Sequence, residues 1–296
     1  MIPEYPNFKK LGFEDIELLS RCLRHAETSI CELNIANILI WKDFDKAKIT
    51  LINKNPCMLL SPENEPPYFL PPLGDNNLIE TVAVCMKHIG KISRAEEHFI
   101  RKLAGYPYHI KCLRNQFDYI YRTRDMAELK GRKFDGKRNQ IKQFKSRFPE
   151  YEFTKATPDL KKDALGLFEK WFDIRRESRH FPKLAHDSQK KAINLAFSNY
   201  ESLDLTGGAL SAEGSLKGFI LGSPINKGTV SVHFSYGDPS VRGTSQMLFH
   251  EAANKVFSSF EFMNLEQDLG IPGLRRSKLS YHPLKLEKKF EIRPST

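Results

Sequence analysis

Several signatures of common protein classes are missing from this sequence of 296 residues. No apolar run approaches the roughly 20 residues that a membrane-spanning helix needs. The first residues lack the charged start and the apolar core of a secretory signal peptide. We therefore expect a cytoplasmic protein without a transmembrane segment. No serine, cysteine or histidine lies in a recognisable nucleophile motif, so the familiar patterns of covalent catalysis are missing too.

Cysteine is scarce, and the sequence offers no zinc-site spacing. The five cysteines are odd in number, scattered and without a CxxC pair, which argues against a disulfide framework. His250 and Glu251 begin like the zinc motif HExxH, but Asn254 stands where the second histidine should be. We expect reduced, mostly buried thiols and no metal.

The composition is that of an ordinary globular protein, with 40% hydrophobic and 28% charged residues. A chain of this length is long enough to form two domains of about 150 residues each. The expected domains are residues 1–148 and 149–296.

Positive charge is concentrated between residues 130 and 148. Eight of these nineteen residues are Lys or Arg and one is Asp, so the segment carries +7 of a net charge of +10. Two glycines precede three apolar residues at helical spacing, which predicts a folded basic helix. Such a cluster favours a nucleic acid, an anionic membrane surface or an anionic cofactor as partner, and a solvated surface helix is the alternative. The cations expected to contact phosphate are Lys130, Arg132, Lys133, Lys137 and Arg138.

Hydrophobic periodicity predicts a mixture of helices and strands in both halves. In the first half we expect helices over 13–27, 76–89 and 94–104, and strands over 38–41, 48–52, 58–60 and 118–122. In the second half we expect helices over 159–176, 187–201 and 243–259, and strands over 206–212, 216–222, 229–236 and 260–265. The order of helices and strands in the second half is typical of an N-acyltransferase domain of the GNAT class. The expected fold is α+β, with tandem GNAT-like domains that each hold a mixed, mostly antiparallel sheet flanked by helices.

The segment Arg242-Gly243 is a candidate cofactor site. Coenzyme A-dependent GNAT enzymes place a pyrophosphate at the start of the helix that begins here. Their small residues let backbone N–H groups close on the pyrophosphate, whereas this chain has Ser245 and the bulky Met247. Coenzyme A is therefore the less favoured donor.

Two acids and several bases lie close together between residues 264 and 281. Glu266 and Asp268 alternate at the end of a predicted strand, so both side chains could face one pocket. Such a pair binds an ammonium group or takes a proton from an attacking amine. Capping of the next turn by Asp268 is the alternative. Trp41 is a candidate for the apolar wall of a pocket, with an ordinary core position as the alternative.

Four short segments taken together resemble one family. They are Asp118-Tyr-Ile-Tyr121, Leu129-Lys-Gly-Arg-Lys133, Lys137-Arg-Asn139, and Glu266-Gln-Asp-Leu-Gly270 with Gly273-Leu-Arg275 and Lys278. In this order they resemble the stand-alone proteins related to the C-terminal domain of phosphatidylglycerol lysyltransferase. The resemblance covers nearly the whole chain.

The resemblance implies an aminoacyltransferase that takes an amino acid from aminoacyl-tRNA to an amine or hydroxyl acceptor, either a lipid or a small molecule. Direct attack on the activated ester requires no covalent enzyme intermediate, and positioning supplies most of the acceleration. Glu266 or Asp268 would bind the amino group or act as base, and Tyr281 would donate a hydrogen bond to the oxyanion. The residues expected to hold tRNA phosphates are Arg275, Lys278 and the segment around Gly131 and Asn139.

Two other functions remain open at this stage. One is a coenzyme A-dependent N-acyltransferase, which Arg242-Gly243 permits. The other is a non-catalytic RNA-binding module, for which the basic segment would suffice.

Overall fold

The computed structural model describes residues 1–24, 28–176 and 186–295. The chain forms two compact units, each built on a seven-stranded mixed sheet. The first unit combines Met1–Asp118 with Glu287–Thr296, and the second is Tyr119–Leu286. No helix in the described ranges is long and apolar enough to cross a membrane.

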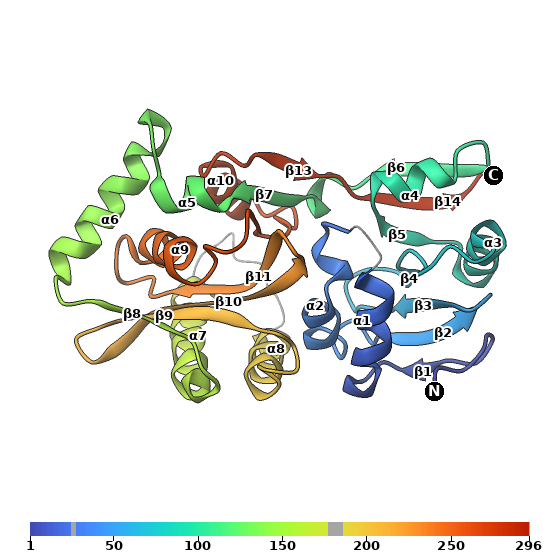
Figure 1. The fold of residues 1–296 in the computed structure, drawn as a ribbon, viewed down its shortest axis with the longest axis horizontal. Coiled ribbons are helices and arrows are strands. Elements are labelled where there is room, and N and C mark those ends of the chain that lie inside the picture. The colour runs from blue at the N-terminus through green and yellow to red at the C-terminus, as the bar shows by residue number, and fades with distance from the viewer. Residues whose placement is uncertain (25–27, 177–185, 296) are drawn as a thin grey trace. The chain divides into compact units, whose positions relative to one another are not determined.

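The first unit holds a sheet of strand order β1-β2-β3-β4-β5-β14-β6 (Figure 1). Only the β4–β5 pair is parallel among the pairings recorded for this sheet. Its strands are β1 (Lys9–Lys10), β2 (Lys48–Ile52), β3 (Asn55–Leu60), β4 (Tyr68–Phe69), β5 (Ile92–Ala95), β6 (Tyr108–Cys112) and β14 (Phe290–Pro294). Its helices are α1 (Ile16–Arg24), α2 (Ile35–Ile40), α3 (Leu78–Ile89) and α4 (Glu97–Lys102).

The core of this unit forms where α3 and α4 pack on the sheet. Val82 and Cys85 of α3 and Phe99 of α4 lie in one buried cluster with Phe69 and Ile292 of the strands. The last strand of the chain, β14, therefore packs in the same core as residues from the first hundred positions.

The second unit holds a sheet of order β13-β7-β12-β11-β10-β9-β8. Its strands are β7 (Asp118–Arg122), β8 (Glu152–Lys155), β9 (Thr206–Ala212), β10 (Ser215–Asn226), β11 (Thr229–Gly237), β12 (Phe262–Asn264) and β13 (Lys285–Glu287). Its helices are α5 (Thr123–Glu128), α6 (Asp135–Arg147), α7 (Lys161–Arg176), α8 (His186–Ser198), α9 (Thr244–Lys255) and α10 (Pro272–Leu279).

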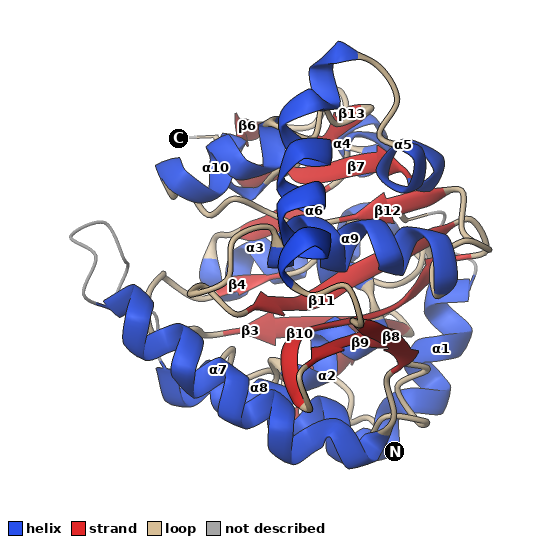
Figure 2. Cartoon of the chain, turned by 90° about the vertical axis from the view of Figure 1, so that its left-hand side faces the viewer, coloured by secondary structure: helices blue, strands red, loops and turns tan. Residues whose placement is uncertain are grey.

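Helices cover both faces of the second sheet. Helices α7 and α8 lie on one face, and α9 lies on the other with α5 and α6 packed against it (Figure 2). The central strands β9, β10 and β11 are antiparallel, and β11 is parallel to β12. The three-stranded antiparallel core and the helix after it agree with the expected order of elements.

The compact units do not divide the chain at the expected boundary between residues 148 and 149. Residues 119–148 belong to the second unit because β7 pairs with β12 and because α6 packs on α9. Residues from 287 onward belong to the first unit because β14 pairs with both β5 and β6.

Two segments of the first unit differ from the prediction. The expected strand over 38–41 is the end of helix α2, whose N-cap Asn34 accepts a hydrogen bond from the Asn37 N–H at 3.0 Å. The expected helix over 94–104 begins only at Glu97, because Ile92–Ala95 form strand β5. The expected first helix over 13–27 is observed as α1, and its last three residues lie outside the described ranges.

Candidate functional site

The Glu266 loop follows β12 in the second unit and has an unusual backbone. Glu266 has φ 58° and Leu269 has φ 53°, a left-handed conformation that a side chain normally avoids. The Lys278 ammonium on α10 holds this loop by donating to the carbonyl oxygens of Leu265 at 2.5 Å, Glu266 at 3.1 Å and Gln267. One partly buried cation therefore fixes this strained loop in place, and strained backbone is common at functional sites.

The Glu266 carboxylate faces the neighbouring strand β11. Its Oε1 lies 2.9 Å from His233 Nδ1 and accepts a hydrogen bond from the Ser231 hydroxyl at 3.1 Å. Burial alone would raise the pKa of Glu266, but the contacts with His233, Lys278 and Ser231 outweigh it and lower the pKa below its ordinary value. Glu266 is therefore an ionised, directed carboxylate at neutral pH.

His233 in turn contacts Ser223 on the adjacent strand β10. The Ser223 Oγ lies 2.8 Å from His233 Nε2. His233 lies at a β-bulge, because Leu221 pairs with Phe234 and Gly222 pairs with Val232, which leaves His233 without an opposite residue. Sequence reasoning missed both residues, since neither stands in a recognisable motif and their contact depends on strand register.

Asp268 has a different environment from Glu266. Arg275 donates to both of its oxygens, at 2.7 and 2.9 Å, and the Tyr119 hydroxyl donates at 2.5 Å. Burial would raise the pKa of Asp268, but these hydrogen bonds hold it well below its usual range. Asp268 and Arg275 thus anchor the loop to α10. Glu266 and Asp268 therefore have different partners, and Arg275 and Lys278 both bind groups within the protein.

The basic segment forms α6 and the turns before it, and its cations divide into two groups. Arg138 is held locally, because it donates to the carbonyl oxygens of Leu129 and Gly131 and pairs with Asp135. Lys137 is half-buried and donates to the Ser280 hydroxyl at 2.6 Å. Arg138 is nevertheless exposed, and so are Lys130, Arg132, Lys133, Asn139, Lys142, Lys145 and Arg147.

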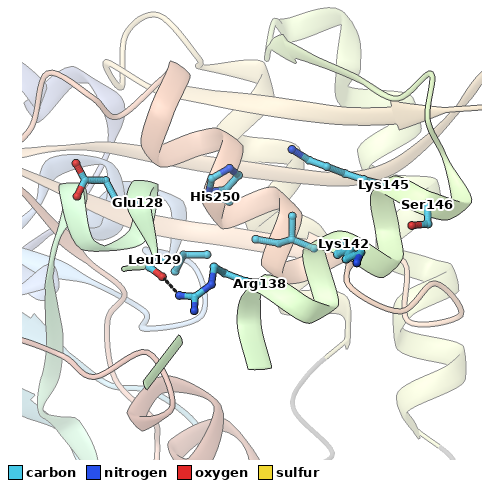
Figure 3. A pocket seen from close by; sticks show the side chains of 8 residues that line it. Glu128, Leu129, Arg138, Lys142, Lys145, Ser146 and His250 are labelled. Carbon is cyan, nitrogen blue, oxygen red and sulfur yellow. Dashed lines mark hydrogen bonds between the residues drawn. The ribbon is translucent and has the colours of Figure 1, made fainter. Parts of the chain in front are cut away.

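A cavity of about 460 Å³ lies between α6, α5 and α9 (Figure 3). Arg138, Lys142 and Lys145 line it from α6, and His250 lines it from α9. Burial lowers the pKa of His250, so its imidazole is neutral at pH 7. The cations of α6 therefore give this groove its charge.

The start of α9 lies against α6. Gly243 has φ 88°, and a Cβ at this position would lie only 2.1 Å from the Gln140 carbonyl oxygen of α6. The backbone of α6 thus occupies the space next to Gly243, while Arg242 is exposed. Gly243 serves the close approach of two helices here.

Tyr281 lies in the core of the second unit, beneath α6. Its ring has the Lys137 ammonium 3.9 Å from its centroid, and its buried hydroxyl lies next to the side chain of Gln246. Burial raises the pKa of Tyr281 above its ordinary value, so the hydroxyl stays protonated and able to donate. Trp41 is partly buried at the end of α2 in the first unit, where its ring packs against Phe44.

One cluster in the first unit has the composition of a metal site. Cys31, Glu32 and Asp118 come within 4.8 Å of one another. The Lys289 ammonium lies among them and contacts all three, with Asp118 Oδ1 at 2.6 Å. The cluster is accordingly an ion-pair network in which a lysine supplies the positive charge.

The sequence matches the protein family described as phosphatidylglycerol lysyltransferase, C-terminal, over residues 23–293. The chain belongs to this family. The resemblance seen in the sequence is therefore confirmed. A comparison with curated proteins found no match.

The fold is also similar to several solved structures. The chain is similar to a conserved protein of unknown function from Bacteroides thetaiotaomicron, with TM-score 0.87 and 27% identity over 99% of this chain and 100% of that chain. It is also similar to L-PGS from Bacillus licheniformis, with TM-score 0.64 and 14% identity over 100% and 94% of the two chains. FemX matches with TM-score 0.62 and 8% identity over 96% of each chain. The last two likenesses concern the fold alone, and the expected α+β class of GNAT-like sheets is confirmed.

Proposed function

We propose that the protein is an aminoacyltransferase that moves an amino acid from aminoacyl-tRNA to an amine or hydroxyl acceptor. The observation that carries the proposal is the match of residues 23–293 to a family named for lysyl transfer. The acceptor class is a lipid or a small molecule, and an anionic membrane surface is a further candidate partner for the basic segment.

The close approach of α6 to the start of α9 supports tRNA over coenzyme A as donor. A pyrophosphate at a GNAT helix N-terminus needs open backbone N–H groups and room beside them. Here the Gln140 carbonyl oxygen comes so close to Gly243 that even a methyl group would collide. The Gln140 carbonyl oxygen also places partial negative charge beside Gly243. The geometry therefore disfavours the first alternative, a coenzyme A-dependent N-acyltransferase.

The exposed cations of α6 support a polyanionic donor. Lys142 and Lys145 line the groove, and Arg147 follows them on the same helix. Phosphates of a nucleic acid are bound mainly by such cations, with release of counterions. In the proposal α6 tracks the tRNA backbone and leaves the acylated end to other residues.

The chemistry requires a carboxylate that is ionised and held in one direction. An aminoacyl ester is already activated, so an acceptor amine or hydroxyl attacks its carbonyl carbon directly and no covalent enzyme intermediate forms. Glu266 is ionised and directed by His233 and Ser231, and it would bind the amino group or assist removal of the proton. The buried Tyr281 hydroxyl is the candidate donor to the tetrahedral oxyanion.

The test is transfer of label from charged tRNA. The purified protein is incubated with aminoacyl-tRNAs that each carry one radiolabelled amino acid, with cell extract as the acceptor source, and the labelled product is identified. Glu266→Gln should lower transfer by at least about 10²-fold, because it removes the charge and keeps the shape. The matched control is Glu261→Gln, an exposed residue just before β12, which should leave transfer unchanged.

The affinity of the same variants for tRNA distinguishes the proposed enzyme from the second alternative, a non-catalytic RNA-binding module. Under the proposal, Glu266→Gln retains tRNA affinity and loses transfer. A wild-type protein that binds tRNA and transfers no label from any aminoacyl-tRNA would contradict the enzyme and favour the module.

A further inference from the structure

Three side chains of the second unit form one continuous chain of hydrogen bonds. Ser223 Oγ lies 2.8 Å from His233 Nε2, and His233 Nδ1 lies 2.9 Å from Glu266 Oε1. The residues come from β10, from β11 and from the loop after β12, so only the folded sheet brings them together.

The direction of this chain follows from the chemistry of its ends. An ionised carboxylate only accepts hydrogen bonds, so His233 Nδ1 must carry the proton that it shares with Glu266. In a neutral imidazole Nε2 is then an acceptor, and the Ser223 hydroxyl must donate to it. This is the serine, histidine and acid connectivity that activates a hydroxyl in acyl-transfer enzymes.

Two costly features of the backbone build the arrangement. A β-bulge places His233 opposite no residue and re-aims its side chain, as bulges beside active sites do. Glu266 adopts a left-handed conformation that Lys278 stabilises. Both Ser223 and the His233 side chain are almost fully buried, which strengthens each electrostatic contact between them.

We propose that Ser223 and His233 form the proton relay of aminoacyl transfer, an inference that rests on the function proposed above. As the acceptor nitrogen or oxygen bonds to the ester carbonyl carbon, it gives its proton to Ser223 Oγ, and the Ser223 proton passes to His233 Nε2. Glu266 stabilises the imidazolium. When the bond from the carbonyl carbon to the ribose oxygen breaks, the proton returns through Ser223 to that oxygen. The products are the aminoacylated acceptor and a free ribose hydroxyl.

This assignment separates the roles of His233 and Glu266. Glu266 has a lowered pKa and is a weak base, whereas a general base works best when its pKa lies near the working pH. Glu266 is therefore a positioning residue that fixes the imidazole tautomer, Ser223 contacts the acceptor, and His233 stores the proton.

The first experiment needs no substrate. Nitrogen chemical shifts of ¹⁵N-histidine-labelled protein report which ring nitrogen of His233 carries the proton, and His233→Gln identifies its signals. The expected form has the proton on Nδ1 and a hydrogen-bond acceptor at Nε2, and Glu266→Gln should disturb it. A neutral His233 with its proton on Nε2 overturns the relay, whatever the outcome of the transfer assay.

The second experiment measures the protein-dependent loss of labelled aminoacyl ester from a mixed aminoacyl-tRNA pool, with ethanolamine as added acceptor and water as the competing one. Ser223→Ala should lower turnover by about 10²- to 10⁴-fold at saturating tRNA and leave the KM for tRNA unchanged. Ser223→Thr keeps a hydroxyl and should restore part of the rate. Ser235→Ala, a serine on strand β11 that takes no part in the network, is the control and should behave as wild type.

Each remaining outcome decides a different point. Equal turnover by wild type and a folded Ser223→Ala protein overturns the relay. An aminoacyl adduct on Ser223 in the intact-protein mass spectrum overturns it in favour of a covalent path. Failure of the wild-type protein to consume any aminoacyl ester overturns the proposed function, and the catalytic role of the relay with it.

Discussion

The Lys289 ammonium lies 2.6 Å from Asp118 Oδ1, and neither side chain has any exposure to solvent. Glu32 and Cys31 also contact this ammonium. The opposite charges hold one another ionised, and the neighbouring acids raise the pKa of Lys289 against the effect of burial. A buried charge that loses its partner costs far more than a surface charge does.

Lys289→Ala should therefore destabilise the first unit strongly. We expect the free energy of unfolding to fall by about 3–5 kcal/mol, because Asp118 and Glu32 are left without their shared cation. Urea unfolding measures the change. Lys288→Ala, at the exposed neighbour, should stay within about 0.5 kcal/mol of wild type. Equal stability of the two variants would show that the cluster does not depend on the lysine.

Stability should fall in acid, and Asp268 should account for part of the loss. The folded state lowers the pKa of Asp268 below the unfolded value of about 3.9, so the unfolded state binds more protons in acid. The contribution of ionised Asp268 to the free energy of unfolding is complete above the pKa that this group has in the unfolded state. It is lost as the pH falls toward the lower pKa of the folded state. When wild type and Asp268→Asn are unfolded in urea between about pH 6 and pH 3, the difference between their free energies of unfolding should begin to narrow at the acid end. Parallel curves would exclude Asp268 as a source of the dependence.

Gly243→Ala should disrupt the contact between α6 and α9. The alanine would need a left-handed φ, and its Cβ would meet the Gln140 carbonyl oxygen. We expect a loss of more than about 2 kcal/mol in the free energy of unfolding. Gly136→Ala, within α6 and with open space around it, should instead stabilise by about 0.5–1 kcal/mol. A mild effect at both positions would mean that the helices separate readily.

Loss of Lys142 and Lys145 should weaken tRNA binding in a salt-dependent manner. Both are exposed and line the groove beside α6. The double alanine variant should flatten the plot of log K against log salt by about 1–2 units, since each phosphate contact contributes about 0.7–0.9. The control, Lys162→Ala with Lys227→Ala, removes the same charge from other exposed sites and should keep the wild-type slope. If both doubles change the slope equally, binding follows net charge and α6 has no special role.

Elements with a strong local signal could be predicted from the sequence. Helix α7 has apolar residues at spacings of three and four, and Glu213 and Gly214 both adopt the positive φ that a tight hairpin requires. The run around α2 is short and apolar at almost every position, so its period could not separate a helix from a strand. The signal that would have decided it is the N-cap Asn34.

The site was predictable only in part, because residue types do not reveal their partners. Glu266 and Asp268 look equivalent in the sequence, yet a histidine faces one and an arginine binds the other. That difference arises from strand register and from the position of α10. Ser223 and His233 are ten residues apart on paired strands, and a single bulge brings them into contact.

Strand β14 lies between β5 and β6, although the whole second unit separates it from them in the chain. During synthesis, residues 119–286 emerge from the ribosome before β14 does. The first sheet must therefore wait with a gap between two strands, and Asp118 must wait without its lysine, while the second unit already has all its strands. Chain order thus places the last strand of the first sheet after every strand of the second sheet, and a chain that ended at residue 287 would hold all the strands of the second sheet but lack β14 of the first.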